Sequence, residues 1–180
     1  MEIDNIVLSK ALSLAHVPRW CIVDTIKNQS VAEHSYNVTV IAMAIYDQIR
    51  LYINETGNLK INILEKALLH DIKESITGDI PSPMKCRDEV LDCSLGDAIV
   101  HVSDYIEAII FIDRYGINVS IVRNYVNDKL QYWITVLLGI LDAGLPPLLK
   151  KAIRQNLNDI TLIKRIYESD YYARQVEAIK

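Results

Sequence analysis

Apolar residues recur at the three- and four-residue spacing of α-helices along almost the whole chain. This spacing predicts helices over about 4–15, 31–49, 62–72, 95–115 and 119–143, with two more near 148–156 and 159–179. Six Gly and five Pro are too few for the turn-rich pattern of an all-β protein. We therefore predict an all-α fold and, since no linker or repeat interrupts the pattern, a single compact domain over residues 1–180.

Local signals place the helix boundaries. Ser30 can accept a hydrogen bond from the amide of Glu33, a capping pattern that predicts the start of the second helix. The same pattern, Asn-Ile-Leu-Glu at residues 62–65, predicts the start of the third. Gly116 is expected to end the fourth helix. Residues 78–88, with two prolines, form the clearest loop and therefore a candidate place for functional residues.

The overall composition limits the cellular setting and the classes of partner. Hydrophobic residues make up 51% of the 180 residues, but the longest apolar run, 134–141, is shorter than the ~18 residues of a membrane helix. The acidic first residues do not match a secretory signal, and three Cys without CxxC spacing favour a reducing compartment. The net charge of −4 gives no general reason to bind nucleic acid. We therefore expect a cytoplasmic protein without membrane or nucleic-acid partners, and the apolar surplus predicts a homo-oligomer.

Histidines and carboxylates suggest a metal site. His34 lies at the start of the second predicted helix, His70 and Asp71 lie at the end of the third, and Asp104 lies within the fourth. Two imidazoles and two carboxylates are a plausible ligand set for one divalent metal. Taken singly, His34 is better explained as a surface histidine at a helix start than as a metal ligand, and a His-Asp doublet is common by chance. The prediction of a metal site therefore depends on the wider sequence context.

Glu74 adds a carboxylate beside the doublet. It follows His70 by four residues and Asp71 by three, a spacing that on a helix places the side chains on one face. A metal ion with a nearby carboxylate can activate water for hydrolysis. The pattern therefore predicts a hydrolytic pair of metal and carboxylate.

Longer motifs supply the context: Arg19-Trp20, Val-Ala-Glu-His-Ser at 31–35, His-Asp-Ile-Lys-Glu at 70–74 and Thr-Gly-Asp-Ile-Pro-Ser-Pro-Met-Lys at 77–85. These motifs closely resemble the HD-domain phosphohydrolases, in particular the bacterial HD-domain 5'-deoxynucleotidases. The resemblance implies an HD-domain helical fold and one divalent transition metal, Zn, Co or Mn. It implies as metal ligands His34, His70, Asp71 and Asp104. It also implies that Glu74 and Asp79 are acid and base carboxylates, Asp79 either protonating the leaving oxygen or positioning Arg19.

One departure from the bacterial pattern concerns the substrate. Only eighteen residues separate Lys85 from Asp104, where the bacterial nucleotidases carry a much longer helical insertion that contributes to base selection. The compact form is similar to the phage dATP triphosphohydrolases, which implies release of deoxyadenosine together with tripolyphosphate or with sequential phosphates. An additional Mg²⁺ on the triphosphate is an option. The alternatives are a 5'-deoxynucleotidase acting on monophosphates, an enzyme for another nucleotide phosphoester, and a helical scaffold with a vestigial site.

Other residues fit a small deoxynucleotide beside the metal. Arg19 and Lys85 supply the positive charge that a phosphate chain requires, although most such cations are simply solvated. Trp20 can pack on the deoxyribose or base and Ile22 can form an apolar wall, although both are also ordinary core residues by type. Because an apolar wall disfavours a ring edge that carries an amino group, we expect dATP to be cleaved ahead of dGTP.

Overall fold

The described part of the chain is helical, as predicted. A computed structural model describes residues 5–50, 53, 58–79, 81, 93–142, 151 and 155. Within those residues, the segments between helices form isolated β-bridges and no extended strand. The helices are α1 (Asn5–Ser13), the short 3₁₀ helix η1 (Leu14–His16), α2 (Val31–Ile49), α3 (Leu59–Leu69), α4 (Glu74–Thr77), α5 (Leu95–Tyr115) and α6 (Ser120–Asp142).

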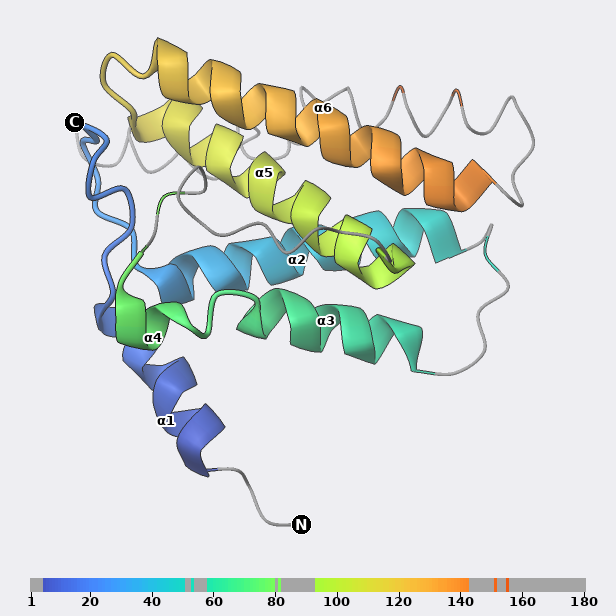
Figure 1. The fold of residues 1–180 in the computed structure, drawn as a ribbon, viewed down its shortest axis with the longest axis horizontal. Helices are drawn as coiled ribbons and strands as arrows, with labels where there is room; N and C mark the ends of the chain where they lie inside the picture. The colour runs from blue at the N-terminus through green and yellow to red at the C-terminus, as the bar shows by residue number, and fades with distance from the viewer. Residues whose placement is uncertain are drawn as a thin grey trace, which may run out of the picture.

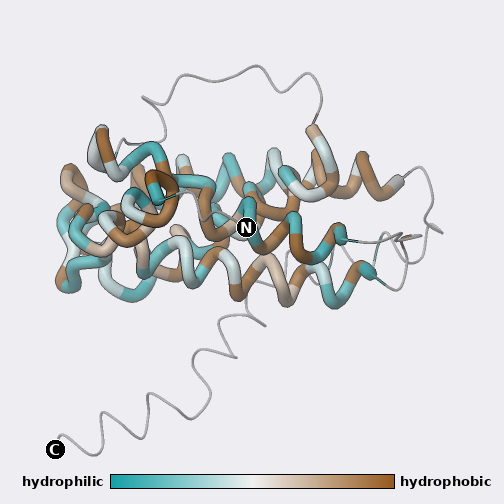
Figure 2. The backbone as a smooth tube through the Cα atoms, turned by 90° about the horizontal axis from the view of Figure 1, so that it is seen from below, coloured by the Kyte–Doolittle hydropathy of each residue, from teal (hydrophilic) through white to brown (hydrophobic). Residues whose placement is uncertain are grey.

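Helix α5 is central to the packing (Figure 1). It contacts α6 as well as α2 and α3, and α2 and α3 also pack on each other. One core cluster joins these four helices, and its most buried large side chains include Ile49, Ile63, Ile99, Ile106, Leu130 and Leu137. Figure 2 shows hydrophobic and hydrophilic residues alternating along the helices, as expected when one face of each helix lies in a core. Burial of each such side chain contributes about 1.5–3 kcal/mol, so the core fixes how these helices sit together.

The predicted bounds of α2 and α5 are confirmed and have local causes. Ser30 caps α2, and its side chain accepts a hydrogen bond from the Glu33 amide. Ser94 and Asp97 form a reciprocal capping box at the start of α5. Gly116 follows the last residue of α5, where an added Cβ would lie only 2.7 Å from a backbone carbonyl oxygen. Glycine therefore permits the close approach of the chain that ends this helix.

The predicted start of the third helix is wrong. Helix α3 begins at Leu59 rather than at Asn62. The Asn62 amide donates to the carbonyl of Asn58, so it already belongs to the first helical turn. Leu59 packs against the core cluster, and this tertiary contact extends the helix beyond the local capping signal.

The third predicted helix also ends early. Helix α3 stops at Leu69, and residues 70–73 form a turn before α4, whereas the sequence predicted a helix through Ile72. The Ile72 amide donates to the Leu69 carbonyl and the Glu74 amide to the Asp71 carbonyl, a three-residue spacing that is tighter than that of an α-helix. The predicted His-Asp doublet therefore lies in a turn between two helices.

The remaining expectations concern the first helix and segments that the structure describes only in part or not at all. The first predicted helix is divided, because its last residues form η1. The helices predicted near 148–156 and 159–179, and most of the loop at 78–88, lie outside the described part of the chain. Among the helices that are described, none combines the length and apolar character needed to cross a membrane.

Candidate metal centre

Side chains with metal-ligating atoms meet from three parts of the chain. His34 lies in the first turn of α2, His70 follows the last residue of α3, and Asp104 lies within α5. Their ligating atoms all lie within 4.8 Å of one another. The Nε2 atom of His34 is 3.2 Å from Nε2 of His70 and 3.1 Å from a carboxylate oxygen of Asp104. One ion could therefore contact all three side chains.

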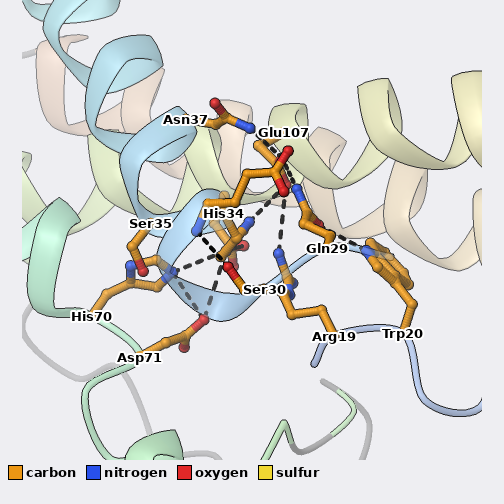
Figure 3. Close-up of polar contacts among 12 residues, drawn as sticks. Arg19, Trp20, Gln29, Ser30, His34, Ser35, Asn37, His70, Asp71 and Glu107 are labelled. Atoms are coloured by element: carbon orange, nitrogen blue, oxygen red, sulfur yellow. Dashed lines mark hydrogen bonds and ion pairs between the residues drawn. The ribbon is translucent and has the colours of Figure 1, made fainter. Parts of the chain in front are cut away.

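Asp71 borders this group. Its Oδ2 atom lies 3.2 Å from Nε2 of His70 and 3.6 Å from Nε2 of His34 (Figure 3). The structure thus brings together the four side chains that the sequence predicted as ligands, and their coordination of a metal stays a prediction. We refer to His34, His70, Asp71 and Asp104 as the ligand cluster.

The hydrogen bonds at Nδ1 of His34 and His70 determine which ring nitrogen of each neutral imidazole carries the proton. Nδ1 of His70 lies 2.7 Å from the carbonyl oxygen of Ala67, which can only accept, so Nδ1 carries the proton. Nδ1 of His34 lies 2.6 Å from a carboxylate oxygen of Glu107, with the same consequence. In the neutral imidazoles both Nε2 lone pairs then face each other and the carboxylates of the cluster. Such a convergence of electron-pair donors fits a cation, and nitrogen and oxygen donors suit Zn, Co or Mn.

The same contacts shift the ionisation of the cluster. Burial and the charge of Arg19 lower the pKa of His34, but Glu107 and Asp104 outweigh them, and the pKa of His34 is raised above its ordinary value. Burial raises the pKa of Asp104, but the hydrogen bond to His34 and the charges of both histidines hold this pKa below its ordinary value. The neighbouring carboxylates therefore favour a proton on His34, and metal binding would compete with this protonation.

Arg19 and Asp79 contact each other, and Arg19 also contacts Glu107, the hydrogen-bond partner of His34. The Nε atom of Arg19 is 4.0 Å from Oδ1 of Asp79, and both side chains are 12% exposed. Oδ2 of Asp79 accepts a hydrogen bond from the Trp20 amide at 3.0 Å. Of the two roles that the resemblance allows for Asp79, its placement favours the positioning of Arg19.

Trp20 has an unusual backbone conformation for a bulky residue. Its φ is +63°, in the left-handed region, which costs on the order of 1–3 kcal/mol unless the surroundings enforce it. Its ring stacks on Phe111 of α5 with centroids 5.7 Å apart, and its Nε1 donates to the side chain of Gln29 at 3.0 Å. These contacts and the Asp79 hydrogen bond hold the residue in place next to Arg19.

Three further predicted site residues have different surroundings. Glu74 begins α4 and its side chain is buried. Ile22 is 76% exposed, so its apolar side chain is open to a ligand. Lys85 lies outside the described residues. Their roles in proton transfer, base selection and phosphate binding stay predictions.

A groove of about 570 Å³ opens next to the cluster. It lies between α3 and α5, and its lining includes His70, Lys66, Asp97 and His101. Its volume is within the range of small-molecule sites. The ring of His101 stacks on Trp133 with centroids 3.9 Å apart, so this histidine lines the groove and packs on α6.

Comparison with known proteins identifies the family. A family model described as 5'-deoxynucleotidase YfbR-like matches residues 8–110, more than half of the chain. The chain belongs to the YfbR-like 5'-deoxynucleotidase family. The resemblance inferred from the sequence motifs is thereby confirmed.

Relatives of the chain include phage and bacterial proteins. The chain is 38% identical to a dATP triphosphohydrolase of Acinetobacter phage SH-Ab 15497, over 46% of its own length and 43% of the relative. It is 30% identical to a dATP triphosphohydrolase of Salmonella phage PMBT28, over 64% of its length and 68% of the relative. A 5'-deoxynucleotidase of Yersinia pestis (strain Pestoides F) is 35% identical over 38% of this chain and 34% of the relative. The matched segments span less than half of the first and third of these relatives.

The fold also matches a solved structure, the HD phosphohydrolase of cyanophage S-2L bound to dA and one catalytic Zn²⁺ ion. The TM-score is 0.61 at 19% identity, and the match covers 89% of this chain and 99% of the other. At this identity the match establishes the fold, and it confirms the predicted HD-domain helical architecture.

Glu107 is the principal polar residue at the site that the sequence patterns did not single out. It lies one helical turn after Asp104, and this three-residue spacing on α5 was the available signal. Burial raises the pKa of Glu107, but the charge of His34 and their hydrogen bond, together with Arg19, hold it below its ordinary value. Its other partners, Gln29 and Asn37, come from distant positions in the sequence, so helical spacing alone could not reveal them.

Proposed function

We propose that the protein is a metal-dependent phosphohydrolase of 2'-deoxyribonucleotides and that dATP is its substrate. The observation that carries the proposal is the convergence of lone-pair donors in the ligand cluster, which Glu107 links to the guanidinium of Arg19. Membership of a family described as 5'-deoxynucleotidases supports a deoxynucleotide substrate, and the two phage relatives support dATP. A divalent ion held by the cluster would supply Lewis acidity to phosphate cleavage.

The residues around the cluster have separate roles in the proposed reaction. Arg19 binds phosphate oxygens, and Asp79 holds its guanidinium in place. Glu74 orients the attacking water and takes its proton as the water oxygen bonds to the α-phosphorus. The bond from that phosphorus to the 5'-oxygen of the sugar breaks, and the 5'-oxygen takes up a proton from solvent while Glu74 releases its proton to solvent. The products are deoxyadenosine and tripolyphosphate.

Binding of the nucleotide involves further predicted residues. Lys85 provides a second phosphate cation, and Trp20 and Ile22 contact the nucleoside. Zn is the first metal to test, because the cyanophage protein of the same fold is described with a catalytic Zn²⁺ ion, and Co and Mn follow. An additional Mg²⁺ on the triphosphate, a cytoplasmic location and a homo-oligomer belong to the same proposal, and light scattering tests the last of these.

A second candidate function is a 5'-deoxynucleotidase that releases inorganic phosphate from deoxynucleoside monophosphates. The description of the family and the Yersinia relative favour it. The same cluster and Arg19 would serve this reaction, with one phosphate in place of three.

Product analysis separates the two candidates. Protein stripped of metal and reconstituted with Zn, Co or Mn is incubated with dATP and with dAMP, and phosphorus NMR identifies the products. Tripolyphosphate from dATP supports the proposal, and inorganic phosphate from dAMP alone supports the second candidate. Absence of hydrolysis of any deoxynucleotide with all three metals would contradict both.

A further inference from the structure

Glu107 is surrounded by hydrogen-bond donors from other parts of the chain. Glu107 lies on α5, and the residue is 4% exposed. Oε2 accepts a hydrogen bond from Nδ1 of His34 at 2.6 Å and faces Nη1 of Arg19 at 3.5 Å. Oε1 accepts from the side-chain amides of Gln29 at 2.6 Å and Asn37 at 3.1 Å (Figure 3). Both carboxylate oxygens are therefore used, each by two donors.

We propose that Glu107 is a positioning residue that couples the metal ligand His34 to the phosphate-binding Arg19. This inference rests on the proposed function. Because an ionised carboxylate can only accept, it keeps the His34 proton on Nδ1 and leaves the Nε2 lone pair for the metal. The same oxygen, Oε2, faces the guanidinium of Arg19. This one atom therefore sets both the tautomer of His34 and the position of the Arg19 guanidinium.

The network continues from Glu107 toward the predicted nucleoside site. Gln29 donates to Glu107 through its amide nitrogen and accepts from Nε1 of Trp20 through its amide oxygen. Gln29 is itself buried, and its backbone carbonyl accepts the Arg19 amide at 2.8 Å. Displacement of Glu107 would therefore affect the metal ligand, the phosphate-binding residue and the tryptophan together.

The substitution Glu107→Gln tests this role with little change in shape. One carboxylate oxygen becomes an NH₂ group, which must then face donors whichever way the amide is oriented. If it faces His34 it displaces the Nδ1 proton, which moves the proton to Nε2 and blocks the metal. If it faces Gln29 and Asn37 it opposes two other NH₂ groups. Either orientation should disturb the position or the tautomer of His34.

Zinc affinity measured without nucleotide, by competition with a chromophoric chelator, is the first readout. We expect Glu107→Gln to bind Zn²⁺ about ten- to a hundredfold more weakly than the parent. We also expect a raised KM for dATP, because Arg19 loses the negative charge of one of its two carboxylate partners. Asp113→Asn is the matched control. Asp113 is also a carboxylate on α5, but it pairs with Arg123. Equal zinc affinity in the parent and a folded Glu107→Gln would overturn the inference.

A second measurement needs only the parent protein and so does not depend on the folding of a variant. Nitrogen NMR of the zinc-loaded protein with labelled histidine should show His34 protonated at Nδ1 and coordinated through Nε2. Coordination through Nδ1 would overturn the inference. A parent that binds zinc in this way but does not hydrolyse deoxynucleotides would disprove the proposed function and leave the positioning role standing.

Discussion

The carboxylate of Asp79 supports the segment before α2 through two contacts, and substitutions can separate them. One oxygen accepts the Trp20 amide at 3.0 Å, and the other lies 4.0 Å from Nε of Arg19. Asp79→Ala should lose both contacts. Asp79→Asn can keep an amide oxygen for the Trp20 amide but loses the charge that faces Arg19.

The expected magnitudes follow from these distances. A hydrogen bond to a charged acceptor contributes about 1.5–3 kcal/mol, and an ion pair as long as 4.0 Å contributes about 1 kcal/mol or less. Asp79→Ala should therefore lower the free energy of unfolding by about 2–3 kcal/mol, or Tm by roughly 4–12 °C for a chain of this length. Asp79→Asn should lower it by about 1 kcal/mol or less. Because Trp20 could then relax from its φ of +63°, these are upper values.

Thermal unfolding followed by circular dichroism measures the effect, with the exposed Asp128→Ala of α6 as a control expected within about 0.5 kcal/mol of the parent. Kinetics then distinguish the two roles of Asp79. A positioning role raises KM for dATP more than it lowers kcat, whereas a proton donor lowers kcat. A Tm for Asp79→Ala equal to that of the parent would refute the structural reasoning. An unchanged KM in Asp79→Asn would refute the positioning of Arg19.

Further substitutions test the other parts of the site and fold. Asp104→Ala should abolish tight zinc binding while His101→Ala retains it, as measured by metal content after dialysis. Glu74→Gln should keep zinc affinity and lower kcat by about a hundred- to ten-thousandfold, and a rate equal to that of the parent would contradict its role. Gly116→Ala should lower the free energy of unfolding by about 1–3 kcal/mol, because its Cβ would meet the Ile112 carbonyl oxygen at 2.7 Å. Zinc at a hundred times its Kd should raise that free energy by about 2.7 kcal/mol, which a thermal shift without nucleotide can check.

Local patterns in the sequence were sufficient where the cause of a structure is local. The bounds of α2 and α5 follow from Ser30, from the apolar spacing and from Gly116, and the structure confirms them. Helix α3 differs because contacts of Leu59 with the core extend it and the turn at residues 70–73 interrupts it. Apolar spacing does not reveal the core contact of Leu59, so the start of this helix could not be predicted from its own residues. The turn at its end is local, but it leaves the apolar spacing unchanged and so gives no signal in the sequence pattern.

In the candidate site, too, residues with a local sequence signal were predicted and a residue defined by long-range contacts was not. The motifs predicted His34, His70, Asp71 and Asp104 as one set, and the structure brings their side chains together although three different segments carry them. Glu107 escaped prediction because its importance comes from its surroundings. A buried carboxylate is recognised by the donors around it, and these donors are up to 88 residues away along the chain.

Two kinds of support hold the side chains that we propose to bind a metal and a phosphate. His34 and Asp104 lie on α2 and α5, and His70 directly follows α3. These three helices pack on one another in the core, so core packing sets the distances between the three side chains. Arg19 lies on a loop and does not share that support, so its position requires separate contacts. Asp79 and Glu107 provide them, and Glu107 also contacts His34 of the ligand cluster. Because Glu107 lies on α5, the core helix that also carries Asp104, its contact with Arg19 links the loop to the core.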